Sequence, residues 1–104
     1  PKKVLIHSVI YEEYLGRDEW GGGDTFALPV TLNFVRVDYM SKFRRSTNAE
    51  DVIFKALMFV DVINSDMEDF KHKSKVTFNG NVMFVEEITP LYAGDLHHYE
   101  IGLV

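Results

Sequence analysis

The stretch KVTFNGNVMFVEEITP, from Lys75 to Pro90, decides the fold class of this chain. Apolar and polar residues alternate on both sides of the pair Asn79-Gly80. An Asn-Gly pair between alternating runs is the strongest short-range signal of a β-hairpin, because both central residues of a type I′ turn need positive φ. A further apolar run, Leu96–Val104, follows a loop predicted at Tyr92–Asp95. The C-terminal third therefore predicts a β-rich protein.

Three earlier segments also have the character of strands. Val4–Leu15 is rich in β-branched and aromatic residues. Val30–Met40 alternates, and its phase slips at Phe34-Val35, which predicts a β-bulge. Val52–Val62 is ambiguous, because its apolar residues share a period of two while Ala, Leu, Met and Lys favour a helix. We favour a strand there, since the alternation spans the whole run.

The remaining segments are predicted connections. Residues 16–28 and 40–51 are expected to form flexible loops, and the polar part of the second, Ser41–Asp51, can extend its flanking strands as a ribbon. Ser65, followed three residues later by Glu68, matches a capping box and predicts one short helical turn within Ile63–Lys73. The fold class is therefore mainly β: a small antiparallel β-barrel or sandwich of about six strands with one short helix and long loops.

Composition limits the possible functions. The 104 residues suffice for one domain, spanning 1–104, and 46% hydrophobic residues argue against disorder throughout. The net charge of −5, from 11 Lys+Arg against 16 Asp+Glu, argues against a general duplex-DNA binder, which needs a basic face. The chain has no Cys, which excludes disulfides and thiolate chemistry.

Targeting signals are not evident either. The apolar residues Val4–Ile6 are followed at once by His7-Ser8, unlike a signal peptide, and no apolar run approaches the roughly 18 residues of a membrane span. The sequence begins at Pro1, as if an initiator Met had been removed. We expect a soluble intracellular protein that does not bind membranes.

The residues that could bind a metal, act in catalysis or bind phosphate lack the arrangement that these roles require. His97 and His98 are neighbours in a predicted strand, so they should point to opposite faces and cannot hold one ion together. Adjacent carboxylates diverge for the same reason, and general acid–base catalysis needs carboxyl groups that converge in a cleft. The glycine run lacks the spacing of a phosphate-binding motif and enters no helix. We therefore expect no enzyme activity, no metal site and no cofactor.

Two segments are candidates for a protein interface. Trp20 stands beside Gly21-Gly22-Gly23, and Trp is enriched at interface hot spots; in the simpler alternative Trp20 packs back onto its own barrel. The dense basic cluster Lys42–Arg45 fits an acidic neighbouring subunit, a solvated connection or, less well, nucleic acid. The candidate interface residues are Trp20, Gly21, Gly22, Gly23, Phe26, Phe43, Arg44 and Arg45.

Several segments, taken in order, resemble a known family. They are Val9–Tyr14, Pro29–Leu32 with Val35–Asp38, Leu57–Ser65, Phe70–Gly80, Pro90–Tyr92 and Leu96–Glu100. Their order resembles that of the minor capsid proteins encoded in head–tail gene clusters of tailed phages and prophages of Gram-positive bacteria. One departure is Asn81-Val82-Met83, where a Lys/Glu-Tyr-like pair is expected, and it concerns only the surface of one strand.

The resemblance implies a head-completion, or stopper, component of the head–tail connector. Such a protein forms a ring below the portal, contacts portal or adaptor and tail proteins, meets DNA only as it passes the channel, and performs no catalysis. Its place would be the head–tail junction of the virion, after assembly in the bacterial cytoplasm. Because the loops would lose entropy on ordering, we expect a monomer in isolation. The alternative is an OB-like barrel that binds single-stranded nucleic acid, which the acidic charge disfavours.

Overall fold

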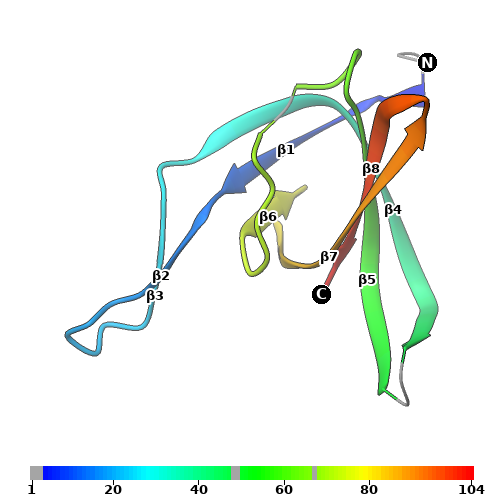
Figure 1. The fold of residues 1–104 in the computed structure, drawn as a ribbon. Coiled ribbons are helices and arrows are strands. Elements are labelled where there is room, and N and C mark those ends of the chain that lie inside the picture. Colours follow the sequence, from blue (N-terminus) through cyan, green and yellow to red (C-terminus); the bar gives the residue numbers. More distant parts are fainter. Residues whose placement is uncertain (1–3, 48–49, 67) are drawn as a thin grey trace.

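The computed structural model describes residues 4–47, 50–66 and 68–104, with the backbone alone for 41–47 and 50–52. Figure 1 shows strands that wrap around a single core, with two ribbons extending from it. The strands are β1 (His7–Glu12), β2 (Tyr14–Arg17), β3 (Asp24–Phe26), β4 (Val30–Thr47), β5 (Glu50–Asp61), β6 (Lys75–Phe78), β7 (Asn81–Ala93) and β8 (Asp95–Leu103).

Six of these strands form a closed antiparallel barrel in the order β1-β4-β5-β8-β7-β6. The pairing of β1 with β6, in which Ile10 faces Thr77 and Tyr11 faces Val76, closes it. β2 and β3 form a separate two-stranded sheet. The predicted class, mainly β with a small antiparallel barrel, is confirmed. Closure pairs the strand edges of the barrel that an open sheet would leave exposed.

The hairpin at the centre of the sequence prediction is present. Asn79 and Gly80 have φ of 50° and 79°, as a type I′ turn requires, and Phe78 pairs with Asn81. The predicted loop at Tyr92–Asp95 is tighter than expected. Ala93 still pairs with Asp95, so that Gly94, with φ of 82°, turns the chain almost alone.

The predicted bulge in β4 is also confirmed. Between the pairs His7–Val35 and Val9–Leu32, β4 contains one residue more than β1, and Phe34 takes a φ of 59°. The extra residue restores the phase, so that Leu32 and Val35 both point into the barrel.

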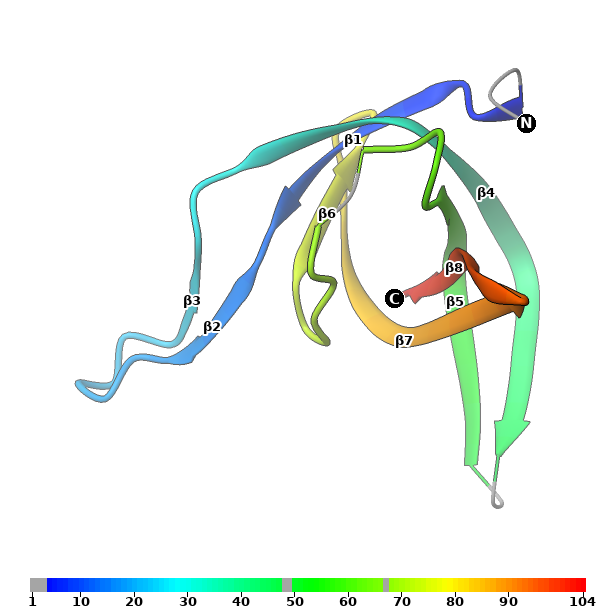
Figure 2. The same cartoon turned by 45° about the horizontal axis from the view of Figure 1, so that its top comes forward.

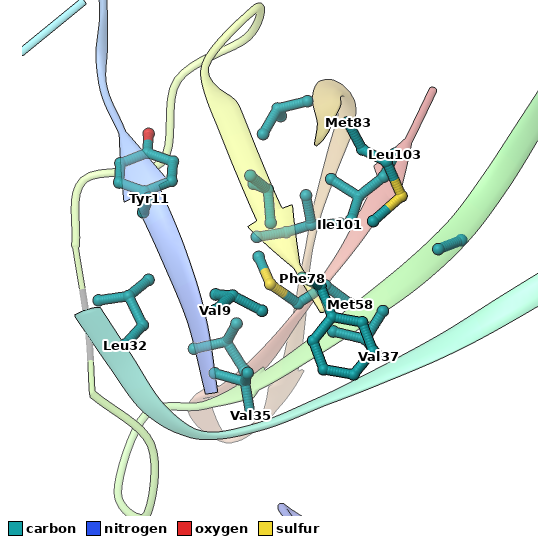
Figure 3. Packing of buried hydrophobic residues seen from close by; sticks show 14 residues of the cluster. Val9, Tyr11, Leu32, Val35, Val37, Met58, Phe78, Met83, Ile101 and Leu103 are labelled. Atoms are coloured by element: carbon teal, nitrogen blue, oxygen red, sulfur yellow. The ribbon is translucent and has the colours of Figure 1, made fainter. Parts of the chain in front are cut away.

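The buried core is built from the alternate apolar residues of the strands. β5 is a strand, as predicted, and buries Phe54, Ala56, Met58 and Val60. Figure 3 shows side chains from β1 and β4–β8 converging on one cluster. Within the described residues, no helix is long and apolar enough to cross a membrane.

The predicted helical turn with Ser65 as its N-cap is wrong for the described part of Ile63–Lys73, which contains no helix. The chain turns at Asp61 instead, whose Oδ1 accepts hydrogen bonds from the backbone N–H groups of Ile63 (2.8 Å) and Asn64 (3.1 Å). The Ser65 hydroxyl is already engaged, because it accepts from Asp61 N (2.9 Å) and donates to the carbonyl of Phe34. These bonds fasten the turn to the β4 bulge.

Candidate functional site

Two β-ribbons extend from the barrel in different directions, one to the lower left and one downward on the right (Figures 1 and 2). The first, here called the Trp20 arm, is the β2–β3 hairpin, Tyr14–Phe26. The second, here called the β4–β5 ribbon, is the distal part of those strands, where pairing continues from Phe43–Phe54 to Thr47–Glu50. Both overlap the ranges 16–28 and 40–51 predicted as flexible loops, and in both the chain is largely paired as strands. The second extends its flanking strands as expected, whereas the first contains an unpredicted hairpin.

The Trp20 arm begins where the predicted first strand breaks. Val4–Leu15 is not one strand, because β1 ends at Glu12 and β2 starts at Tyr14. At this point the Tyr14 N–H donates to the hydroxyl of the buried Ser74 (3.0 Å), which also bonds the hydroxyl of the buried Tyr11 (3.0 Å). Tyr11 in turn accepts from the N–H of Lys71 (2.9 Å). This buried network fixes the point at which the chain leaves the barrel.

Aromatic contacts also hold the base of the arm against the barrel. The rings of Tyr14 and Phe26 pack edge to face at 5.8 Å, and Phe26 also lies 6.5 Å from the ring of Phe84 on β7. The Lys75 ammonium sits 4.6 Å from the centre of the Phe26 ring, within cation–π range. Phe26, predicted as an interface residue, therefore packs half-buried against its own barrel.

Charged groups add further contacts at the base. The Lys71 ammonium pairs with the carboxylate of Glu13, and this hydrogen bond is the main reason why the pKa of Lys71 is raised. Partial desolvation, followed by the hydrogen bond that the Tyr14 hydroxyl donates to Asp24 (3.0 Å), raises the pKa of Tyr14. Both pairs are exposed, so they orient the arm more than they stabilise the fold.

The tip of the arm needs glycine at two of its three glycine positions. Gly21 and Gly23 have φ of 81° and 90°, where other residues are strained. A Cβ at Gly22 would stand 2.4 Å from Asp18 Oδ2. Asp18 closes the turn, since its N–H donates to the Gly23 carbonyl (2.8 Å) and its Oδ1 accepts from Trp20 N (3.1 Å).

Trp20 is 92% exposed at this tip. The alternative that it packs back onto its own barrel is therefore wrong. The arm also carries Leu15 at 59% exposure, and Leu28, just beyond β3, is 86% exposed. A large aromatic side chain held open to solvent on an anchored hairpin is typical of a contact surface rather than of a core.

The other predicted interface residues lie on the β4–β5 ribbon. Phe43, Arg44 and Arg45 pair through their backbones with Phe54, Ile53 and Val52. Their side chains lie outside the described part of the structure. These residues belong to a ribbon remote from Trp20, so the predicted interface residues form two separate groups.

The expectation that His97 and His98 point to opposite faces is wrong. Their rings meet edge to face, with the two Nδ1 atoms 2.9 Å apart. They lie close to the tight turn at Gly94, where the β7–β8 register shifts between Leu91 and Tyr92, so the alternation of a regular strand fails there. Within the described segments, no three His, Asp or Glu side chains converge as metal ligands would.

Sequence reasoning missed a groove of about 600 Å³ at the base of the β4–β5 ribbon. Its described lining residues are Tyr39, Met40, Lys55, Asn81, Val82 and Met83. Tyr39 is 51% exposed, and its hydroxyl accepts from Asn81 Nδ2 (2.8 Å), which joins β4 to the start of β7. No sequence motif marks this groove, because it forms between strands about forty residues apart.

The fold and its exposed surface define a small β-barrel protein with two extended ribbons. The sequence matches the family model described as "Minor capsid protein" over residues 1–103. The chain therefore belongs to this family of minor capsid proteins of phages, and it is a virion-associated structural protein. A search of curated proteins found no match.

Proposed function

We propose that this minor capsid protein is a head-completion, or stopper, component that forms a ring below the portal and receives the tail. The observation that carries the proposal is the exposed Trp20 on an arm fixed by the buried Tyr11–Ser74 network. An anchored arm with an uncovered aromatic tip supports a role in which another protein surface covers that tip. The role is structural, without catalysis.

The closed barrel is a second observation that supports the same role. Closure pairs β1 with β6, and the two ribbons and the exposed apolar side chains remain available for contacts with other subunits. The ribbons point in different directions (Figure 2), which suits a subunit that contacts more than one neighbour.

Sedimentation velocity tests this proposal, with the full chain alone and mixed with the portal and adaptor proteins of the same head–tail gene cluster. We expect a monomer alone and incorporation into a large complex in the mixture. A chain that stays monomeric in the mixture would contradict the proposal. If that monomer bound a single-stranded oligonucleotide in a salt-sensitive way, the nucleic-acid alternative would replace it.

A further inference from the structure

We propose that the Trp20 arm of one copy docks into the groove at the base of the β4–β5 ribbon of the next copy. This inference rests on the proposed ring and names the contact that would propagate it. The tip and the groove belong to different parts of the same chain. Each copy would therefore give an arm to one neighbour and accept an arm from the other.

The groove offers space and a partly apolar lining for an indole side chain. Its volume of about 600 Å³ lies within the range of roughly 300–1,000 Å³ that is usual for binding pockets. Val82, 48% exposed, and Tyr39, 51% exposed, offer apolar and aromatic surface. The polar contact between Asn81 and Tyr39 holds one wall in place.

The charges of the two surfaces are complementary. The arm carries Asp18, Glu19 and Asp24 against a single basic residue, Arg17. Of the described residues that line the groove, Lys55 is the one that bears a charge. The ribbon segment next to it, 40–55, contains four basic residues and two acidic ones. An acidic tip approaching a basic groove is favoured, whereas a tip approaching another tip is repelled.

The placement of the two surfaces favours a head-to-tail contact. In both Figure 1 and Figure 2 the arm extends to the lower left and the β4–β5 ribbon extends downward on the right, so the arm is well separated from the ribbon of its own chain. An interface between two different patches of identical subunits is heterologous, and it closes into a ring when the rotation between subunits permits. Docking of the arm would therefore extend from one copy to the next around the ring.

Cysteine cross-linking tests the contact directly, because the natural chain has no Cys. The variant with Glu19→Cys and Val82→Cys is assembled with the portal and adaptor proteins and treated with a short bismaleimide. We expect a ladder of dimers, trimers and higher oligomers of this chain. Each copy would be linked through its arm cysteine to one neighbour and through its groove cysteine to the other. The matched control combines Glu19→Cys with Ile63→Cys, because Ile63 is 83% exposed but lies beyond the other end of β5.

The outcomes separate this inference from the proposed ring. If sedimentation shows the complex but the ladder is no stronger than in the control, the docking contact is wrong and the ring proposal stands. Cross-linking of Val82→Cys to a different protein would likewise overturn it. If no complex forms at all, the proposed function fails, and the docking contact fails with it.

A charge exchange gives a second test. Glu19→Lys or Lys55→Glu alone should raise the concentration needed for assembly by roughly two- to fivefold, as expected for one exposed ion pair. The double variant should return to the natural value, because it restores opposite charges across the contact. Additive losses in the double variant would contradict direct contact between the two surfaces.

Discussion

Gly102 shows how closely the barrel core is packed around one residue. A Cβ built at this position would lie 2.4 Å from Cε1 of Phe54, which is itself buried. The contact joins β8 to β5 in the middle of the sheet, where neither backbone can move without breaking pairs. The lack of a side chain at Gly102 is therefore what allows the Phe54 ring to fill the core.

Gly102→Ala should consequently destabilise the protein by about 1–3 kcal/mol, the usual cost of overpacking a core. Urea unfolding of both proteins measures it. Gly22→Ala is the matched control, since its Cβ would meet the carboxylate of Asp18 at the same 2.4 Å, but that exposed side chain can move. Equal losses in the two variants would contradict the packing explanation.

Gly80 is constrained by backbone conformation instead. Its φ of 79° is strained for a β-branched residue, so Gly80→Val should cost about 1–3 kcal/mol. Gly80→Asn should cost less, because Asn tolerates positive φ. Thermal unfolding of the three proteins compares them, and unchanged stability of the valine variant would contradict the observed turn.

At the scale of elements, the Ser74 hydroxyl joins the end of β1, the start of β2 and the segment before β6. Ser74→Ala would leave the N–H of Tyr14 without its partner at a partly buried site. We expect a loss of about 1–3 kcal/mol and faster hydrogen exchange of the Tyr14 amide. Ser8→Ala serves as control, because Ser8 is exposed. An unchanged exchange rate would mean that other contacts anchor the arm.

The stabilisation that Asp61 gives to the turn after β5 should decrease at acidic pH. Desolvation raises the pKa of Asp61, but the hydrogen bonds from Ile63 and Asn64 outweigh it, so the pKa lies below its ordinary value. The ionised carboxylate therefore stabilises the folded state at pH values above the unfolded pKa of about 3.9. This stabilisation is lost as the pH falls through the lower pKa of the folded state.

Asp61→Asn keeps an oxygen acceptor but removes the charge. We expect the variant to be less stable than the natural protein near neutral pH, and the difference to shrink below about pH 4. Urea unfolding of both proteins across this range measures the difference. A difference that does not change with pH would show that the charge contributes nothing to the turn.

At the scale of the whole molecule, replacing Trp20 should affect assembly but not folding. Because its side chain is 92% exposed, Trp20→Ala should change the free energy of unfolding by no more than about 0.5 kcal/mol. The same variant should lose most of its incorporation into the proposed complex with portal and adaptor proteins, measured by sedimentation velocity. Tyr92→Ala, which removes an aromatic residue 68% exposed away from the arm, is the control. A large drop in thermal stability would place Trp20 in a contact that the structure does not show.

The sequence determined the features that depend on neighbours along the chain. The type I′ turn at Asn79-Gly80, the strand at 52–62 and the slip of phase at Phe34 follow from local conformational preference and from alternation, and all three are confirmed. The exposed tip at Trp20 could be predicted too, because three adjacent glycines cannot build a core. The same local rules failed at Ser65, whose hydroxyl bonds a carbonyl from a strand thirty-one residues away.

Only the tertiary structure decided where the ribbons lie and what surrounds them. Barrel closure places β1 beside β6 and brings Ser74 to the start of the arm, which separates the predicted first strand into β1 and β2. The register shift opposite Leu91 and Tyr92, where His97 is the extra residue of β8, brings His97 and His98 together. The groove lined by Tyr39 and Val82 exists only because distant strands meet there. Barrel closure and the groove depend on strands far apart in sequence, and the histidine contact depends on a shift in strand pairing, so short-range patterns carry no information about them.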